Sequence, residues 1–403
     1  MNEYKKGKRL KRVYKETIAK YLIVAAILAM VVIFFKSVKV TPLISDDGTE
    51  FAKATVLEVN EETTQGDEMY SGSQKVTLSI TSGTFKGEVV EGDSMNGYLY
   101  GAYCKEGEKV IVQTGENDGE IFASVYNYDR ESEIAVLVIV FLAVMWIVGG
   151  KKGINSVISL VFTVAVIIMM YLPMLYLGVS PFLAAVLAGV LITSVSMLMI
   201  GGLTAKAFCS IAGTVCGVVI AGVVAMIFGN VAHINGFNTE EIETLHYIGQ
   251  HTNIDVGGLL FSGIIIASLG AVIDTAMSVA TSLNEIAQTS PGIGARALFR
   301  SGMNIGRDMI GTMSNTLILA FVGGSLNTMI IIYAYSYSIH QTLNMYSIGI
   351  EIMKGISGSL GVILTVPFVS AVSAVFFGKK KGKVLEDGME SEKEEELTAI
   401  KQS

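Results

Sequence analysis

Long apolar runs separated by short polar connections dominate the chain. A helix needs roughly 20 apolar residues to cross a hydrocarbon core of about 30 Å. The runs that approach or exceed this length predict eight membrane-spanning helices, at 18–36, 133–150, 154–173, 180–200, 207–229, 256–284, 307–334 and 352–378. We interpret the first run as an uncleaved anchor, because no small-residue cleavage site follows it.

A second pattern, alternation of apolar and polar residues, occupies the segment between the first two runs. Short stretches such as KVTLSI and KVIVQT are separated by turns rich in Gly, Asp and Asn. This period of two predicts about five mostly antiparallel strands in a small β domain over 40–132. The pattern fits an OB-like and an SH3-like barrel equally well. We interpret the acidic surface of this domain as a solvated face, with cation capture at the mouth of a pathway as the alternative.

Composition and charge give the chain an orientation. Of the 403 residues 51% are hydrophobic and only 16% are charged, against about 25% in a soluble domain. Lys and Arg fall in alternate connections, so the positive-inside rule places both termini in the cytoplasm. The predicted parts are a basic cytoplasmic N-terminus (1–17), the first helix (18–36), the extracytoplasmic β domain (40–132), a seven-helix bundle (133–378) and a charged cytoplasmic tail (379–403).

Polar side chains interrupt the predicted span at 256–284 along one helical face. At 100° per residue this face holds Gly263, Ala267, Gly270, Asp274, Ser278, Thr281 and Glu285. Its first half is small, which lets another helix approach, and its second half is polar. An ionisable side chain inside a span is costly unless it faces a partner or water, so Asp274 is the leading candidate functional residue.

The following span carries a similar stripe, formed by Asn304, Asp308, Gly311 and Asn315 with Arg307 beside it. Because the two spans are antiparallel, we expect the stripes to face each other, with Asp274 near the middle of the membrane. Glu285 and Arg307 then form a structural ion pair at the cytoplasmic edge. Further candidates for binding a solute or an ion are Ser278, Thr281, Asp308 and Asn315.

The last span combines a charged pair with a strip of glycines. Glu351 and Lys354 lie three residues apart near its outer end and are able to pair, and Glu351 joins the candidate binding residues. The glycines that follow in GISGSLG fit close packing between helices. Pro367 predicts an interruption of this helix.

Motifs for cofactors or catalysis do not emerge from the sequence. The four histidines are scattered over predicted loops and the three cysteines form no CxxC pair, so no metal site is predicted. The chain contains no Walker A, HExxH or Gly-x-Ser-x-Gly motif. We therefore expect no catalytic residue and no cofactor, and the protein is predicted not to be an enzyme. A separate energising subunit stays an open alternative.

Several long stretches of the chain resemble the YibE/F-like bacterial membrane proteins. They include YNYDRES, GGKKGINSVISL, DVGGLLFSGIIIASLGAVIDTAMSVATSLNEI and LFRSGMNIGRDMIGTMSNTLILAFVGGS, up to VPFVSA. The resemblance runs collinearly from the β insert to Lys380. It implies a multi-pass architecture in the bacterial plasma membrane, and it makes Asp274, Glu285, Arg307, Asp308 and Asn315 parts of the family pattern. It implies no substrate.

The sequence leaves three functions open. The first is a transporter or permease for an ion or small solute that uses the membrane-embedded carboxylates. The second is a non-catalytic membrane component whose β domain docks a partner or senses a signal. The third is an intramembrane aspartyl protease with Asp274 and Asp308 as its dyad. The expected partners are the lipid bilayer, a small solute or cation, and a second copy or another membrane protein, with no nucleic acid.

Overall fold

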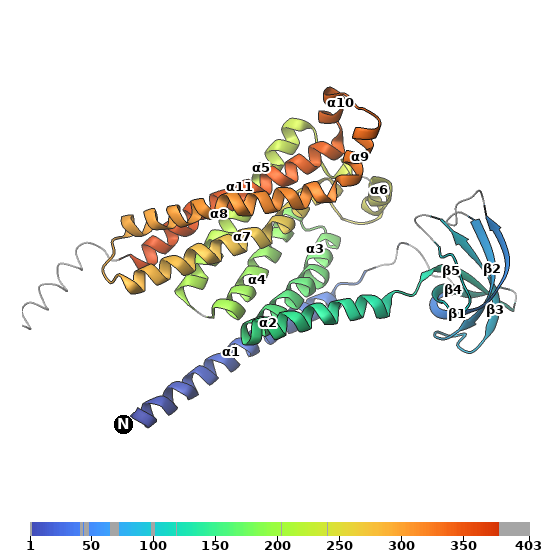
Figure 1. Cartoon of the computed structure of the whole chain (residues 1–403), viewed down its shortest axis with the longest axis horizontal. Helices are drawn as coiled ribbons and strands as arrows, with labels where there is room; N and C mark the ends of the chain where they lie inside the picture. Colours follow the sequence, from blue (N-terminus) through green and yellow to red (C-terminus); the bar gives the residue numbers. More distant parts are fainter. Residues whose placement is uncertain are drawn as a thin grey trace, which may run out of the picture. The chain divides into compact units, whose positions relative to one another are not determined.

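The computed structural model describes residues 2–40, 43, 48–64, 72–97, 101–117, 119–202, 204–239 and 241–378. The chain divides into two compact units (Figure 1). One is Thr41–Val148, and the other combines Met1–Val40 with Gly149–Ser403. The charged tail predicted at 379–403 lies outside the described residues.

The first unit contains a five-stranded closed barrel, as the alternating pattern predicted. Its strands are β1 (Thr49–Thr64), β2 (Gly72–Ile80), β3 (Val89–Asn96), β4 (Lys109–Asn117) and β5 (Glu120–Tyr128). They close in the order β1-β2-β3-β5-β4. All neighbouring strands are antiparallel except β3 and β5, which pair in parallel.

The interior of the barrel is apolar apart from a small polar network. Side chains of Val76, Leu78 and Ile80 alternate into the core along β2. Gln74, on the same strand, is 2% exposed, and its amide pairs with the backbone of Cys104. The Gln74 Nε2 donates to the Cys104 carbonyl at 3.2 Å, and the Cys104 N–H donates to Gln74 Oε1 at 2.7 Å. This side chain therefore fastens the segment before β4 to the barrel.

Replacing Gln74 by leucine is expected to destabilise the barrel by about 1–3 kcal/mol. The change leaves the buried N–H and carbonyl of Cys104 without partners, and each such group costs free energy. Amide hydrogen exchange of the full chain measures the loss as weaker protection of β1–β5. The matched change Gln113→Leu removes one partly exposed side-chain hydrogen bond and should have a smaller effect. Equal effects of the two changes would argue against the structural role of Gln74.

A pair of salt bridges fastens the barrel to the helix that leaves it. Lys53 on β1 lies 3.1 Å from the Asp129 carboxylate and 2.7 Å from that of Glu131, the first residue of α2. The Lys53 ammonium and the backbone N–H of Glu131 both donate to Asp129 and lower its pKa. The motif YNYDRES thus forms the joint between β5 and α2.

The helices account for most of the remaining chain (Figure 1). The long helices are α1 (Asn2–Ser37), α2 (Glu131–Val166), α4 (Pro181–Gly201), α5 (Ala205–Ala232), α7 (Val256–Thr289), α8 (Ala295–Gly324) and α11 (Tyr346–Phe377). The short ones are the π-helix η1 (Ile167–Tyr171), α3 (Leu172–Tyr176), the 3₁₀-helix η2 (Gly236–Asn238), α6 (Ile242–His251), α9 (Leu326–Ala334) and α10 (Ile339–Leu343).

The described helices include six that are long and apolar enough to cross a membrane. The count becomes seven if α8 and α9, which meet at a bend of 61°, form one span. The sequence predicted eight, because it separated 133–150 from 154–173. In the structure both fall within Glu131–Tyr176, which counts as one span although two helices meet there at a kink close to the predicted break. The backbone leaves the helical region only at Gly150 (φ 53°, ψ −133°), a conformation that favours glycine.

Two other helices differ from the prediction. Helix α8 begins at Ala295, well before the predicted start at residue 307, because ARALFRSGMN continues the helix with polar residues that hydropathy does not count. Helix α11 runs without interruption through Pro367. A single proline removes one backbone hydrogen bond, and neighbouring helices hold α11 together across that position.

Small residues bring these helices together, as the glycine content predicted. Helix α11 packs against α5, α7 and α8. At its contact with α5, a side chain built at Gly361 would approach the Gly217 carbonyl and Ala221 Cβ to 2.8 Å. At its contact with α8, a side chain at Gly306 would collide with Val366. Backbones approach this closely only where glycine leaves room, and this matches small-residue packing in membrane helices.

Candidate functional site

The polar stripe of α7 faces away from the helices on which α7 packs. The buried face of α7 includes Val272, Ala276 and Val279. The opposite face carries the predicted stripe, in which Asp274, Ser278 and Glu285 are exposed and Thr281 is half-buried. A side chain built at Gly263 or Gly270 would have no other atom within 4 Å. These stripe glycines therefore pack against nothing in the described part of the chain.

Helix α8 is oriented in the same way, which corrects the expectation that the two stripes face each other. The residues that α8 buries are Leu298, Gly302, Gly306 and Leu317. Asn304, Asp308, Gly311 and Asn315 all lie on the opposite face and are exposed. The physical reason is the glycine pair, since Gly302 and Gly306 let α8 approach Ser370 and Val366 of α11. The stripes lie on adjacent helices and both point outward.

The predicted ion pair between Glu285 and Arg307 is not formed. Both side chains are exposed, and no salt bridge within 4.0 Å joins them in the described structure. The connection between α7 and α8 spans only residues 290–294. Counted from the helix ends, Glu285 lies at about the level of Arg300, about two turns closer to the connection than Arg307.

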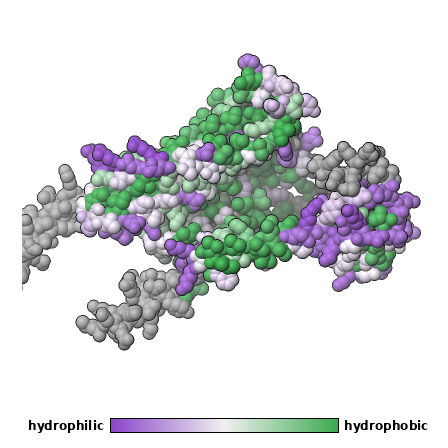
Figure 2. All heavy atoms as spheres, in the orientation of Figure 1, coloured by the Kyte–Doolittle hydropathy of each residue, from purple (hydrophilic) through white to green (hydrophobic). Residues whose placement is uncertain are grey.

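Together the two stripes form a surface that we call the α7–α8 polar face. It consists of the exposed residues Asp274, Ser278, Glu285, Asn304, Arg307, Asp308 and Asn315, with the half-buried Thr281. Figure 2 shows hydrophilic surface along the first half of α8 beside the apolar surface of the other helices. Among the described residues, neither Asp274 nor Asp308 has a hydrogen-bond or salt-bridge partner. No hydrogen bond joins these two carboxylates, whereas an aspartyl protease dyad shares a proton.

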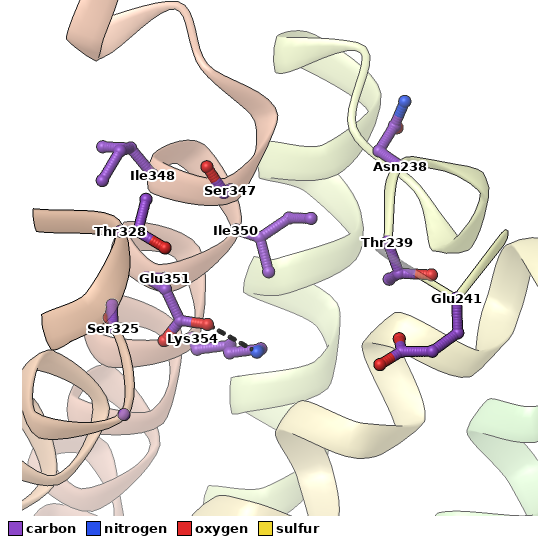
Figure 3. A pocket seen from close by; sticks show the side chains of 11 residues that line it. Asn238, Thr239, Glu241, Ser325, Thr328, Ser347, Ile348, Ile350, Glu351 and Lys354 are labelled. Carbon is purple, nitrogen blue, oxygen red and sulfur yellow. Dashed lines mark hydrogen bonds and ion pairs between the residues drawn. The ribbon is translucent and has the colours of Figure 1, made fainter. Parts of the chain in front are cut away.

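The other candidate, Glu351, lies in a separate pocket at the opposite end of α8. The Lys354 ammonium donates to Glu351 Oε1 at 2.7 Å, so the predicted pair is confirmed. Figure 3 shows this pair on one wall of a cavity of about 250 Å³. The polar residues around it are Asn238, Thr239, Glu241, Ser325, Thr328, Ser347, Glu351 and Lys354.

A broken helix shapes this pocket. Helix α8 ends at Gly324 and α9 starts at Leu326, so Ser325 sits at the bend. The Ser325 N–H and Oγ both donate to the Phe321 carbonyl, which holds the break. Glu351 and Lys354 come from the first turns of α11, and Glu241, the residue before α6, lies across the cavity. Discontinuous helices form binding sites in many transporters.

The structure therefore separates the predicted site residues into two places. Asp274 is about 22 Å from the end of α7, near the middle of that helix. Glu351 is only about 7.5 Å from the start of α11. Sequence reasoning did not identify Ser325, Thr328 and Glu241 as lining residues. The polar break GGSLNT inside an apolar span was the available signal for the first two.

No group of three or more His, Cys, Asp or Glu side chains among the described residues is placed to hold a metal ion. The features above define a mostly helical protein with several long apolar helices, compatible with a membrane protein, and a small β barrel near its N-terminus.

The family model described as YibE/F-like protein matches residues 137–379, more than half of the chain. The chain belongs to this family, as the sequence resemblance indicated. The match begins after the barrel, so YNYDRES and the β insert lie outside it. No curated protein and no solved structure matches the chain.

Proposed function

We propose that the protein is a transporter or permease for a small cation or solute in the bacterial plasma membrane. The observation that carries this proposal is Asp274, an exposed carboxylate without an internal partner halfway along an apolar helix. In this proposal the chain crosses the membrane eight times, because the two parts of Glu131–Tyr176 cross separately, and both termini are cytoplasmic. The barrel, whose strand order fits an OB-like Greek key, lies outside.

A carboxylate at this depth needs water or a partner. A charged side chain in the centre of a bilayer costs several kcal/mol unless it faces a cavity or another protein. The residues one and two turns along the same face, Ser278 and Thr281, add hydroxyl oxygens. Carboxylate and hydroxyl oxygens are hard ligands that suit small hard cations. The α7–α8 polar face therefore supports a pathway for a cation or a protonated solute.

A second copy of the chain is our proposal for what encloses this face. The face is complementary in charge near the α7–α8 connection, because α7 presents Glu285 while α8 presents Arg307 and, one turn before Asn304, the exposed Arg300. The carboxylates of Asp274 and Asp308 lie farther from the connection, where the face is acidic on both helices. A two-fold rotation about an axis along the membrane normal places α7 of one copy against α8 of the other. Glu285 and Arg300 then meet at the same depth, since each lies about 6–8 Å from its helix end. The open glycines allow the close approach.

Reconstitution into proteoliposomes tests the proposed function. The full chain is expected to move a small cation down an imposed gradient, followed with dyes for protons and for alkali-metal ions. Protein-free liposomes from the same lipid give the background. Flux no greater than this background for protons and for every alkali-metal ion tested would contradict transport by the bundle alone.

Cysteine cross-linking between differently tagged chains tests whether a second copy packs against the α7–α8 polar face. In a background with Cys104→Ser, Cys209→Ala and Cys216→Ala, one chain carries Gly270→Cys and the other Asn315→Cys. These two positions are about 28–30 Å from the ends of α7 and α8 that meet at the connection, so their depths match. We expect a disulfide between the two introduced cysteines, which links the differently tagged chains and requires Cα atoms within about 7 Å.

The control for this experiment pairs Leu187→Cys with itself, because Leu187 is an exposed apolar position on α4. Cross-linking of the α7–α8 pair should be several-fold more efficient than cross-linking of the control in native membranes. Equal yields at both positions would show random collision and would exclude a two-fold contact through the α7–α8 polar face.

A further inference from the structure

The cavity beside Glu351 continues into an apolar groove. A second cavity of about 190 Å³ adjoins the first, and the two share Ser325, Ile348 and Glu351 in their walls. The rest of the groove is apolar and is lined by Ile318, Phe321, Val322, Met329, Ile352 and Ile356, with Gly355. A polar chamber and an apolar groove thus meet at the Glu351 carboxylate.

The charges of the polar chamber favour a cationic group. Its described walls contain the carboxylates of Glu241 and Glu351 and the ammonium of Lys354. Lys354 is engaged by Glu351, while Glu241 lies across the chamber from this pair (Figure 3). Hydroxyl groups of Ser325, Thr328 and Ser347 add acceptors around the same space. The described walls therefore carry one carboxylate in excess over their ammonium. A ligand ammonium between Glu241 and Glu351 would meet Glu241, the Glu351 oxygen that Lys354 leaves free, and the surrounding hydroxyl oxygens.

The groove has room for a hydrocarbon tail. At Gly355 a built side chain would only touch Ile318 and Phe321, at 3.7 and 3.9 Å. Among the lining side chains, Ile318 is 40% exposed and Ile356 is 52% exposed, so apolar surface of the groove is free to be covered by a ligand. Burying each methylene of a ligand in such a groove gains about threefold to fourfold in affinity.

We propose that the two adjoining cavities bind a small amphiphile with an ammonium head and an apolar tail. The head sits between Glu241 and Glu351, and the tail follows the groove past Gly355 between α8, α9 and α11. This site is separate from the α7–α8 polar face, so the proposal does not depend on transport by Asp274. The amine can belong to a soluble alkylamine-like molecule or to the headgroup of a lipid, because the recognised chemistry is the same.

Calorimetry on the full chain in phosphatidylcholine nanodiscs tests this proposal. Hexylammonium is expected to bind about tenfold more tightly than butylammonium, because it buries two more methylenes. Hexanol and hexanoate, which lack the cationic head, should bind at least tenfold more weakly than hexylammonium. Empty nanodiscs correct for partition into the bilayer. Equal binding of hexylammonium, hexanol and hexanoate after this correction would overturn the proposal.

Variants separate the head from the tail. Glu351→Gln should lower affinity for hexylammonium at least tenfold, and Gly355→Leu should remove the difference between the hexyl and butyl probes. If Glu351→Gln fails to fold, Glu241→Gln tests the same head site from the exposed end of α6. Glu243→Gln, also on α6 but outside both cavities, is the matched control and should bind as the parent does. Loss of binding in the control together with the variants would argue against this site.

Added phosphatidylethanolamine distinguishes the two sources of the amine. If its headgroup enters the chamber, this lipid weakens hexylammonium binding in proportion to its content in the nanodisc. If a soluble amine is the ligand, binding stays unchanged. Either result assigns the source, whereas failure of hexylammonium to bind with both lipid compositions overturns the proposal.

Discussion

Asp274→Asn is expected to lower solute movement by reconstituted protein at least about tenfold while the bundle stays folded. The asparagine keeps the shape of the side chain but removes the charge that would bind a cation. Interactions with a charged group are worth about 1.5–3 kcal/mol, so flux should fall at least about tenfold. Folding should be unaffected, because in the described structure Asp274 makes no hydrogen bond or salt bridge that the change could break.

The matched control is Asp93→Asn, an identical chemical change at an exposed position of β3 in the barrel. It should leave flux at the level of the parent chain. Ser278→Ala and Asp308→Asn are expected to give intermediate losses, since they remove neighbouring oxygens of the same face. Normal flux through Asp274→Asn, with the protein eluting as folded material, would remove Asp274 from the mechanism.

The largest structural effect is expected at Gly217, where α5 meets α11. Any side chain there would collide with Thr365 Oγ1 and would lie 2.9 Å from the Gly361 carbonyl. Thr365 cannot simply turn away, because its hydroxyl donates to the same Gly361 carbonyl at 2.7 Å. Gly217→Val should therefore separate the two helices and destabilise the protein by about 1–3 kcal/mol or more, as overpacking does.

Thermal unfolding in detergent measures this effect. Gly323→Ala is a control of the same kind, a glycine substitution near the end of α8 with no other atom within 4 Å of the new side chain. It should unfold at about the same temperature as the parent. If Gly217→Val unfolds no earlier than Gly323→Ala, the close contact between α5 and α11 does not exist in the folded protein.

Much of the architecture followed from two periodicities. Alternation at period two located the strands of the barrel, and apolar runs located the helices. The extra helical turns at the start of α8 were missed because hydropathy marks the membrane rather than the helix. The break that the sequence placed after residue 150 coincides with the kink at Gly150, but hydropathy did not show that helix continues on both sides of it without a loop. Neither difference changes which residues lie on one helical face.

The orientation of the stripes could not be predicted from phase alone. Helical phase divides α8 into two faces, but both carry glycines, Gly302 and Gly306 on one and Gly311 on the other. Which face packs inward depends on the partner surface, here Val366 and Ser370 of α11, which is distant in sequence. The four-residue spacing of Gly302 and Gly306 was the available signal for the packed face. The candidate residues of the stripes were identified, but their contacts were not.

The pocket at Glu351 shows the same limit. Glu351 and Lys354 are three residues apart on one helix, so their pairing follows from local geometry. Glu241 and Ser325 reach the same cavity from α6 and from the α8–α9 bend, which only the tertiary fold brings together. Local chemistry was therefore predictable, and the assembly of distant segments into a cavity was not.

Accessibility of the α7–α8 polar face to water tests the central claim most directly. A charged, membrane-impermeant thiol reagent is added to membranes that contain the Ser278→Cys variant in the cysteine-free background. Position 278 lies one turn from Asp274. The proposed pathway predicts that this cysteine reacts rapidly, and that Leu187→Cys on the apolar surface of α4 does not. Modification of Ser278→Cys no faster than that of Leu187→Cys would show that water does not reach the α7–α8 polar face, and would contradict a transport pathway at Asp274.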